Sequence, residues 1–290
     1  MLGVKQMLKA FGAAILAMSI GGCSSTEFWL ANAPNRFEHV ERHLDLAYGD
    51  LHRQQLDILS PPHAAGLPVV VFFYGGSWIE GRKEDYRFVA TTLAEHGIVA
   101  VVADYRLYPE VTFPAFEEDG ARAIAWVQHH IGEYGGDARN IVLMGHSAGG
   151  HTAAFLAFDH DWLQHFGADP TAISGLIGLS GTYVFVPDSD VLRAAFPAPY
   201  SDRDWQPIRF VDAHAPPTLL LHGLADKEVL PQEAIDLRDA LRRQSVRVEL
   251  HLYPHRGHAA TVAPFARLAY WRTPSIVAET VAFVRGVSPR

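Results

Sequence analysis

The stretch "IVLMGHSAGGH", residues 141–151, decides the fold that the sequence predicts. An apolar run typical of a buried strand leads into a G-x-S-x-G pattern at residues 145–149, and small and apolar residues that can open a helix follow. In a nucleophile elbow, such a serine takes a strained backbone conformation, and the flanking glycines let strand and helix cross closely. The alternative is a tight turn whose serine only caps the helix. The pattern makes Ser147 a candidate nucleophile.

Buried β-type runs alternate with helical segments on both sides of this stretch. The runs "LPVVVFFYGGSW", "IVAVVADYR", "ISGLIGLSGTY", "PTLLLHG" and "VRVELHLYP" read as strands, and residues 84–96, 116–134, 148–158, 231–243 and 274–285 as helices. Two earlier runs, "HLDLAYG" and "RQQLDILS", predict an antiparallel pair joined by a turn. This alternation predicts an α/β fold of about eight mostly parallel strands with helices on both faces.

Size and charge narrow the class of protein. The chain has 290 residues, 49% hydrophobic and 19% charged, which predicts one globular domain with at most a lid. The long irregular stretch 184–217 is the expected cap segment, because few connections in compact domains are so long. A net charge of −8 argues against binding nucleic acid and against docking on a membrane through a basic face.

The N-terminus has the pattern of an export signal. Lys5 and Lys9 precede the apolar run "FGAAILAMSI", which is too short to span a bilayer and ends in small residues. The sequence "IGGC" at residues 20–23 resembles the lipobox of bacterial lipoproteins, whose cysteine carries lipid after processing. We therefore expect a signal peptide over residues 1–22, lipid attached to Cys23, a polar tether over 23–37 and a catalytic domain over 38–290.

These features predict a lipid-anchored protein of the bacterial cell envelope, in the inner or the outer membrane. A plain signal peptide with an incidental cysteine is the alternative. Because Cys23 is the only cysteine, it cannot form a disulfide within the chain.

A nucleophilic serine needs a base and an orienting acid, which in this topology follow in the order Ser, Asp, His on loops after later strands. Asp226 follows the run "PTLLLHG", whereas Asp212 and Asp169 lie before strands, at the wrong edge. Two histidines follow "VRVELHLYP". We favour His258 over His255 as the base, because His258 lies further out on a glycine-containing loop.

The stretch "FFYGGSW" offers an oxyanion hole, since its glycines let backbone N–H groups approach a substrate carbonyl. We expect Gly76, Ser77 and Ala148 to donate to the oxyanion, with Gly75 shaping the turn; a glycine-rich turn without a ligand is the alternative. Trp78 and Tyr183 lie at strand ends and are candidate pocket walls, although both can equally be core aromatics.

The ordered set "YGGSW", "DYRL", "YGGD", "GHSAGG", "HGLAD" and "GH" resembles α/β-hydrolases of the carboxylesterase type, in the branch related to hormone-sensitive lipase, feruloyl-esterase-like domains and kynurenine formamidase. The resemblance spans residues 67–258. It implies Ser147 as nucleophile, Asp226 as acid, His258 as base and the loop around Gly76 as oxyanion hole. Much of this branch carries a histidine where Tyr74 stands, which affects loop packing and the shape of the substrate pocket. We therefore count Tyr74 as a third candidate pocket residue.

These observations favour a serine hydrolase that cleaves esters with short acyl or small alcohol groups through an acyl-enzyme, with no metal or cofactor. An amidase or peptidase on the same fold, including an arylformamidase-like enzyme, is one alternative. A non-catalytic binding protein on a hydrolase scaffold is another. The sequence predicts no oligomeric state.

Overall fold

A single sheet of eight strands, in the order β1-β2-β4-β3-β5-β6-β7-β8, crosses the computed structural model, which describes residues 25–33, 39–269 and 273–287. The strands are β1 (Glu41–Ala47), β2 (Gln55–Ser60), β3 (Leu67–Phe73), β4 (Val99–Ala103), β5 (Gly136–His146), β6 (Ile173–Leu179), β7 (Thr218–Gly223) and β8 (Val248–Tyr253). β2 pairs antiparallel with β1 and β4, and the remaining pairs are parallel. The predicted α/β fold with about eight mostly parallel strands is confirmed.

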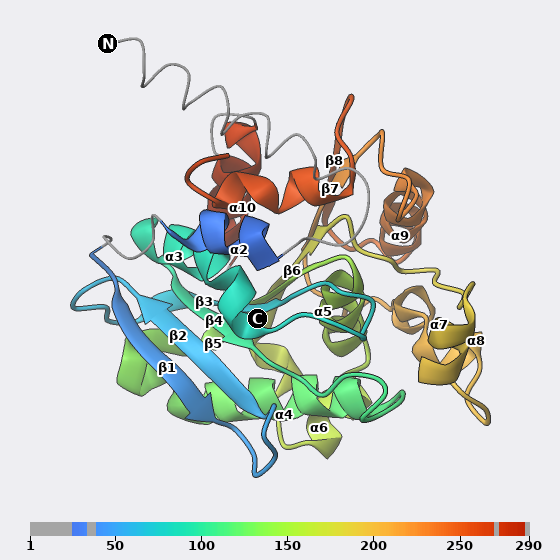
Figure 1. Ribbon diagram of the computed structural model, residues 1–290, viewed down its shortest axis with the longest axis horizontal. Helices are drawn as coiled ribbons and strands as arrows, with labels where there is room; N and C mark the ends of the chain where they lie inside the picture. The colour runs from blue at the N-terminus through green and yellow to red at the C-terminus, as the bar shows by residue number, and fades with distance from the viewer. Residues whose placement is uncertain (1–24, 34–38, 270–272, 288–290) are drawn as a thin grey trace.

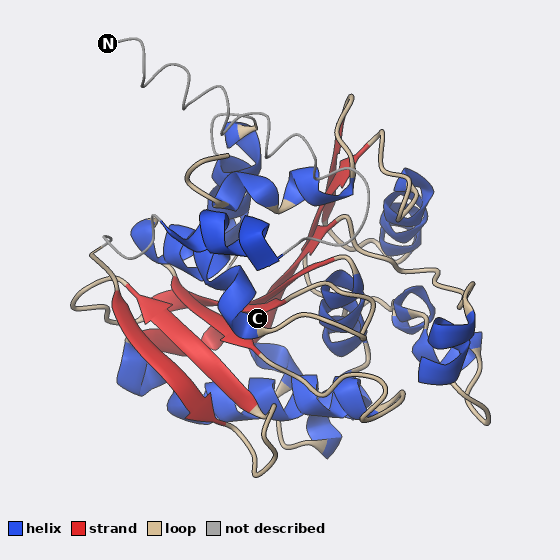
Figure 2. Cartoon of the chain, viewed as in Figure 1, coloured by secondary structure: helices blue, strands red, loops and turns tan. Residues whose placement is uncertain are grey.

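Helices cover both faces of the sheet (Figures 1 and 2). One side carries α2 (Ser25–Asn32), α3 (Arg87–Glu95) and α10 (Pro274–Gly286); the other carries α4 (Ala115–His130), α5 (Ala148–Phe158), α6 (His160–His165) and α9 (Pro231–Arg243). Short 3-10 turns add η3 (Lys83–Tyr86), η4 (Ile131–Tyr134), η5 (Pro170–Ala172), η7 (His258–Thr261) and η8 (Ala263–Phe265). Every residue of β4, β6 and β7 is buried, which explains why these runs are apolar without alternation.

The irregular stretch 184–217 contains three short helices, α7 (Asp190–Ala195), α8 (Asp202–Trp205) and η6 (Pro207–Phe210), outside α5 (Figure 1). Aromatic side chains attach it to the domain: the ring of Phe196 lies 4.8 Å from that of Trp78 and 5.6 Å from that of Phe113. The indole of Trp205 donates to the carbonyl of Phe185 at 3.2 Å. The segment is therefore a packed cover beside the carboxyl ends of the strands.

The N-terminal segment differs from the expected polar tether. Residues 25–32 form α2, whose Phe28 packs on Tyr86 with ring centroids 5.0 Å apart. Asn32 Nδ2 donates to the carbonyl of Asp85 at 2.8 Å. α2 therefore belongs to the domain in this structure. The leader and Cys23 lie outside the described residues, among which no helix is long and apolar enough to cross a membrane.

Candidate active site

Ser147 lies in a sharp turn between β5 and α5. Its backbone has φ 55° and ψ −124°, a combination that a residue with a side chain rarely adopts, and its N–H donates to the carbonyl of Leu179 at 3.1 Å. The flanking glycines permit the crossing: a Cβ on Gly145 would lie 2.0 Å from the carbonyl oxygen of Gly149, and one on Gly149 would lie 2.1 Å from that of Phe73. This is the geometry of a nucleophile elbow.

Asp226 and His258 meet on the loops that follow β7 and β8. His258 Nδ1 lies 2.8 Å from Asp226 Oδ2, and the other carboxylate oxygen accepts the N–H groups of Glu228 and Val229 at 3.0 Å each. The Asp226 carboxylate is fully buried, whereas the His258 side chain is 10% exposed. The acid is thus held by the backbone, and it orients the ring of the base.

Two opposing effects set the protonation of Asp226. Burial alone would raise the pKa of its carboxyl, but hydrogen bonds from His222, His258 and the backbone outweigh burial and hold the pKa well below its usual range. Because an ionised carboxylate only accepts, Nδ1 of His258 carries the proton, and Nε2 is left to accept one. The pair therefore has the tautomer that a general base requires.

Two further histidines contact this pair, and the sequence interpretation missed both. His222 Nε2 lies 2.9 Å from the carbonyl of Val229 and 3.3 Å from Asp226 Oδ2. A histidine within the buried run "TLLLHG", four residues before Asp226, was a signal that could have revealed it. His146 Nε2 lies 3.3 Å from the carbonyl of His258, and burial together with the nearby His258 lowers the pKa of His146 to about 3.

The rejected rivals lie elsewhere. His255 is exposed in a turn with φ 60°. Asp169 caps η5 by accepting the N–H of Thr171 at 2.9 Å, and Asp212 is exposed beside His214. None of the three lines a cavity that contains Ser147.

Two cavities meet at Ser147. The one we call the His-side cavity has a volume of about 270 Å³ and is lined by Phe28, Gly75, Gly76, Ser77, Glu80, Gly81, Asp85, Tyr86, His146, Ser147, Glu228 and His258. The cap-side cavity, of about 390 Å³, is lined by Ser77, Trp78, Ser147, Ala148, Thr182, Val184, Phe185, Val186, Asp188, Leu192, Glu228, Val229, Leu230, Gln232, Glu233 and Asp236. The expected oxyanion donors Gly76, Ser77 and Ala148 therefore all lie at the walls beside Ser147.

The loop after β3 holds an unusual backbone next to the serine. Ser77 and Trp78 both have positive φ, 54° and 57°. The carbonyl of Gly76 accepts the N–H of Ile79 at 2.9 Å, and the carbonyl of Trp78 accepts that of Tyr108 at 2.8 Å. These bonds, with the buried ring of Trp78, fix the loop in a conformation that costs energy in isolation.

Of the three proposed pocket aromatics, Trp78 alone lines one of the two cavities described above. Trp78 forms part of the cap-side wall. Tyr183 is fully buried, and its hydroxyl packs against the backbone of Gly178 and Gly181, so it is a core residue and not a pocket wall. An aromatic side chain is equally suited to a pocket wall and to the core, so the residue type of Tyr183 could not decide between the two.

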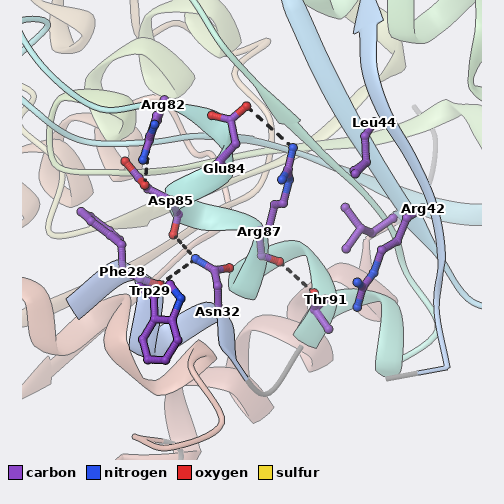
Figure 3. A pocket seen from close by; sticks show the side chains of 11 residues that line it. Phe28, Trp29, Asn32, Arg42, Leu44, Arg82, Glu84, Asp85, Arg87 and Thr91 are labelled. Atoms are coloured by element: carbon purple, nitrogen blue, oxygen red, sulfur yellow. Dashed lines mark hydrogen bonds and ion pairs between the residues drawn. The ribbon is translucent and has the colours of Figure 1, made fainter. Parts of the chain in front are cut away.

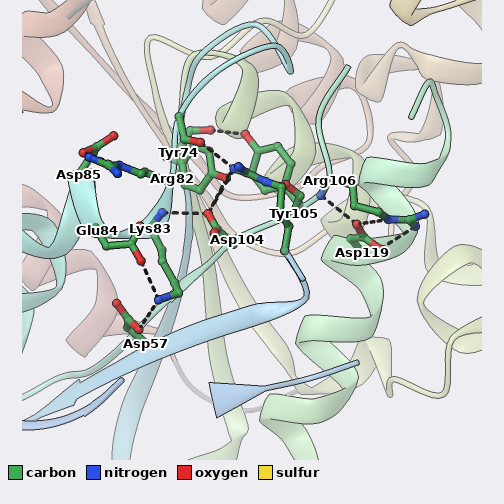
Figure 4. Close-up of polar contacts among 12 residues, drawn as sticks. Asp57, Tyr74, Arg82, Lys83, Glu84, Asp85, Asp104, Tyr105, Arg106 and Asp119 are labelled. Carbon is green, nitrogen blue, oxygen red and sulfur yellow. Dashed lines mark hydrogen bonds and ion pairs between the residues drawn. The ribbon is translucent and has the colours of Figure 1, made fainter. Parts of the chain in front are cut away.

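Tyr74 is also a core residue, which corrects its assignment to the pocket. Its hydroxyl donates to Asp104 Oδ1 at 2.7 Å and accepts from Arg53 at 2.8 Å, and its ring stacks on Tyr105 at 4.6 Å (Figure 4). Burial raises the pKa of Tyr74 well above its ordinary value. Tyr74 thus belongs to a polar network beside the loop after β3, in which Arg53 also donates to the carbonyl of Gly81. The sequence pattern did not reveal this network.

No group of three or more His, Cys, Asp or Glu residues that could hold a metal ion is present in the described ranges. The arrangement offers instead a strained serine, a carboxylate-oriented imidazole and backbone N–H groups around shared cavities. Chemically, these are the parts needed for acyl transfer.

Comparison with known proteins places this site in a family. The prolyl oligopeptidase family model matches residues 117–272, more than half of the chain, and the BD-FAE model matches residues 56–171. A probable isoprenylcysteine alpha-carbonyl methylesterase of Arabidopsis thaliana is 31% identical over 236 residues, covering 73% of this chain and 56% of that protein. The probable carboxylic ester hydrolase LipM of Mycobacterium tuberculosis is 31% identical over 250 residues, covering 78% of this chain and 58% of that protein.

Solved structures agree with the fold. Thermogutta terrifontis esterase 2, phosphonylated by cyclosarin, superposes with a TM-score of 0.69 at 26% identity, over 87% of this chain and 96% of that one. A truncated carbohydrate esterase from gut microbiota gives a TM-score of 0.70 at 20% identity, over 83% and 96%, which shows the fold alone. The chain spans little more than half the length of the two curated relatives. From the family match and the shared fold, we conclude that the chain belongs to the prolyl oligopeptidase family and to the α/β-hydrolases of the carboxylesterase type.

Proposed function

We propose that this protein is a serine hydrolase that cleaves carboxylic esters through an acyl-enzyme. Ser147 attacks the ester carbonyl while His258 takes the proton of the Ser147 hydroxyl. Asp226 holds the imidazole in the tautomer that carries its proton on Nδ1. Backbone N–H groups of Gly76, Ser77 and Ala148 stabilise the oxyanion. The proposal rests on one observation above all: His258, held by Asp226 at 2.8 Å, lines the same cavity as a serine in a strained turn.

We propose that the two cavities take the two halves of an ester. His258 returns its proton to the departing alkoxide, so the alcohol must lie within reach of its ring. His258 lines the His-side cavity and not the cap-side cavity. The alcohol therefore occupies the His-side cavity, and the acyl chain extends toward Trp78, Phe185 and Leu192.

The size of these cavities supports small substrates. Ligand sites usually have volumes of roughly 300–1,000 Å³. The His-side cavity, at about 270 Å³, lies just below this range, and the cap-side cavity, at about 390 Å³, lies near its lower end. The cap segment packs on the domain through Phe196 and Trp205, whose rings lie 4.8 Å from that of Trp78 and 6.1 Å from that of Phe113. Esters of acetic or butyric acid should accordingly react faster than emulsified long-chain triglycerides.

An amidase or peptidase is the second candidate, because the prolyl oligopeptidase family model matches residues 117–272. Esters and amides share the acyl-enzyme route and differ in the leaving group that His258 must protonate. A p-nitrophenyl acetate assay paired with p-nitroacetanilide separates the two: we expect hydrolysis of the ester at a far higher kcat/KM.

The triad assignment is tested by Ser147→Ala, His258→Ala and Asp226→Asn in the same ester assay. Each should lower kcat roughly a thousandfold or more, because triad members act as a unit. His255→Ala is the matched control on the same loop and should retain activity. If His255→Ala abolishes turnover while His258→Ala does not, the assignment of the base is wrong.

We further propose that the protein is exported and anchored through lipid on Cys23. The proposal rests on the residues Lys5 and Lys9, the short apolar run after them and the lipobox-like "IGGC". Since a single acyl chain gives only marginal attachment, firm anchoring requires several chains.

A further inference from the structure

We propose that α2 is the outer wall of the alcohol pocket and that Phe28 limits the size of the leaving alcohol. This inference rests on the proposed esterase function and on the assignment of the alcohol to the His-side cavity. Phe28 lines that cavity together with Ser147 and His258, although more than a hundred residues of chain separate it from either. The N-terminal helix thereby takes part in the site.

Two contacts attach α2 to η3. The ring of Phe28 packs on Tyr86 at a centroid distance of 5.0 Å. Asn32 Nδ2 donates to the carbonyl of Asp85 at 2.8 Å, a bond drawn in Figure 3, which shows a neighbouring pocket that Phe28, Asn32 and Asp85 also line. Asp85 and Tyr86 line the same cavity as Phe28. Because an isolated helix of eight residues is marginal in water, these tertiary contacts are what hold α2 in place.

Phe28 and Tyr86 are the two lining residues of the His-side cavity that carry a benzene ring. Gly75, Gly76 and Gly81 contribute no side chain to the cavity, and Tyr86 is buried with 6% exposure. Phe28 is half-buried and belongs to an element outside the sheet scaffold. Its ring forms the part of the wall that comes from outside the sheet scaffold, and it limits the alcohol to a small one such as methanol or ethanol.

The substitution Phe28→Ala tests this assignment in the full chain. We compare kcat/KM for ethyl acetate and benzyl acetate, which share an acyl group, by pH-stat titration of the acetic acid released. We expect the benzyl-to-ethyl ratio to rise about tenfold or more in Phe28→Ala, because the wall is removed. Phe28→Trp enlarges the wall and should lower the benzyl-to-ethyl ratio. This second variant tests the proposal even if Phe28→Ala does not fold.

Trp29→Ala is the matched control, since Trp29 follows in the same helix, is 61% exposed and does not line the His-side cavity. It should leave the ratio unchanged. The ratio of ethyl butyrate to ethyl acetate should also stay unchanged in Phe28→Ala, because the acyl group lies on the other side of Ser147. Leu192→Ala should alter that acyl ratio instead.

The two proposals fail in different ways. If wild-type protein hydrolyses neither acetate, or if Ser147→Ala hydrolyses them equally well, the esterase function is wrong. If hydrolysis depends on Ser147 but the benzyl-to-ethyl ratio is the same in wild type, Phe28→Ala and Trp29→Ala, only the role of Phe28 is overturned. A fall in kcat/KM by the same factor for both acetates in Phe28→Ala would also overturn the proposed role of Phe28. Such a result would mean that Phe28 supports the structure and does not select between alcohols.

Discussion

At the scale of single residues, the site depends on a serine in a backbone conformation that its own side chain disfavours. Ser147 has φ 55° and ψ −124°. The hydrogen bond from its N–H to the carbonyl of Leu179 and the crossing of β5 with α5 hold it in this conformation. Conformations of this kind cost about 1–3 kcal/mol and persist only where the surrounding structure imposes them. Ser147 lines both cavities, so the strain lies at the proposed nucleophile itself.

Ser147→Gly should therefore be more stable than Ser147→Ala, even though both lack the nucleophile. Glycine relieves the strain but costs roughly 0.5–1 kcal/mol of additional chain entropy, so we expect a net gain of about 1 kcal/mol over alanine. Urea unfolding of the two variants measures this difference. Equal stability would mean that the turn is not strained.

His146 should make the protein sensitive to acid. Burial, followed by the nearby His258, lowers the pKa of His146 to about 3, whereas an unfolded histidine titrates near about 6.5. Between these pH values the unfolded chain binds a proton that the folded chain does not, so stability falls as pH drops through this window, by up to about 1.4 kcal/mol per pH unit. Above pH 6.5 the residue has no such effect.

The variant His146→Gln should accordingly lose less stability than wild type between pH 6.5 and pH 4. The exposed His52 offers the control, and His52→Gln should follow the wild-type curve. Chemical denaturation at several pH values gives the comparison. Parallel curves for wild type and His146→Gln would contradict the burial argument.

Residue positions were predictable from sequence where topology dictates them. The order of strands placed Asp226 and His258 on neighbouring loops, because the carboxyl ends of parallel strands share one edge of the sheet. Tyr74 and Tyr183 were misplaced because a residue at the end of a strand points either into a cavity or into the core, and sequence does not state which. The contacts of Tyr74 with Arg53 and Asp104 join segments far apart in the chain.

At the scale of elements, two helices were predicted to the residue, whereas the helix expected over 116–134 is divided into α4 (Ala115–His130) and η4 (Ile131–Tyr134). α5 spans Ala148–Phe158 and α9 spans Pro231–Arg243, as the sequence indicated. α2 was missed because "STEFWLAN" has no helical periodicity of apolar residues. Its helix depends on packing against η3, a contact that only the tertiary structure supplies.

The crossing of β5 and α5 should not tolerate a methyl group. A Cβ on Gly149 would lie 2.1 Å from the carbonyl oxygen of Phe73, a backbone atom that cannot move without displacing β3. We expect Gly149→Ala to cost about 1–3 kcal/mol of stability and to reduce ester turnover, since Ser147 and the oxyanion loop meet there.

Gly132→Ala is the matched control, because a Cβ at Gly132 meets no atom within 4 Å. Its stability should stay within about 0.5 kcal/mol of wild type. Thermal or urea unfolding, with turnover measured on the folded fraction, distinguishes the two variants. If Gly149→Ala behaves like Gly132→Ala, strand and helix are not in the close contact described.

At the scale of the whole molecule, the residue proposed to carry the lipid lies close in sequence to the helix that lines the proposed alcohol pocket. α2 begins at Ser25, two residues after Cys23, and it supplies Phe28 to the His-side cavity. Residues 25–32, within the stretch 23–37 expected to be a polar tether, therefore form a helix that packs on the domain. The contacts that hold α2 come from Phe28 and Asn32 and do not require the lipid.

Replacing Cys23 by alanine should change the location of the protein and not its chemistry. We expect wild type in the membrane fraction and Cys23→Ala in the soluble fraction, with equal esterase activity per folded molecule. Fractionation with mass spectrometry of the N-terminal peptide provides the measurement. A processed wild-type protein that stays soluble and carries no lipid mass on Cys23 would identify the leader as an ordinary signal peptide.

The central claim, that Ser147 is a nucleophile activated by His258 and Asp226, is tested most directly by a fluorophosphonate probe read by intact mass and peptide mapping. The account predicts one adduct per wild-type chain, located on Ser147, with ester hydrolysis lost in proportion to labelling. Ser147→Ala should remain unlabelled, and His258→Ala should label far more slowly. A folded wild-type protein that hydrolyses esters but takes up no probe, or an adduct that persists in Ser147→Ala, would contradict the account.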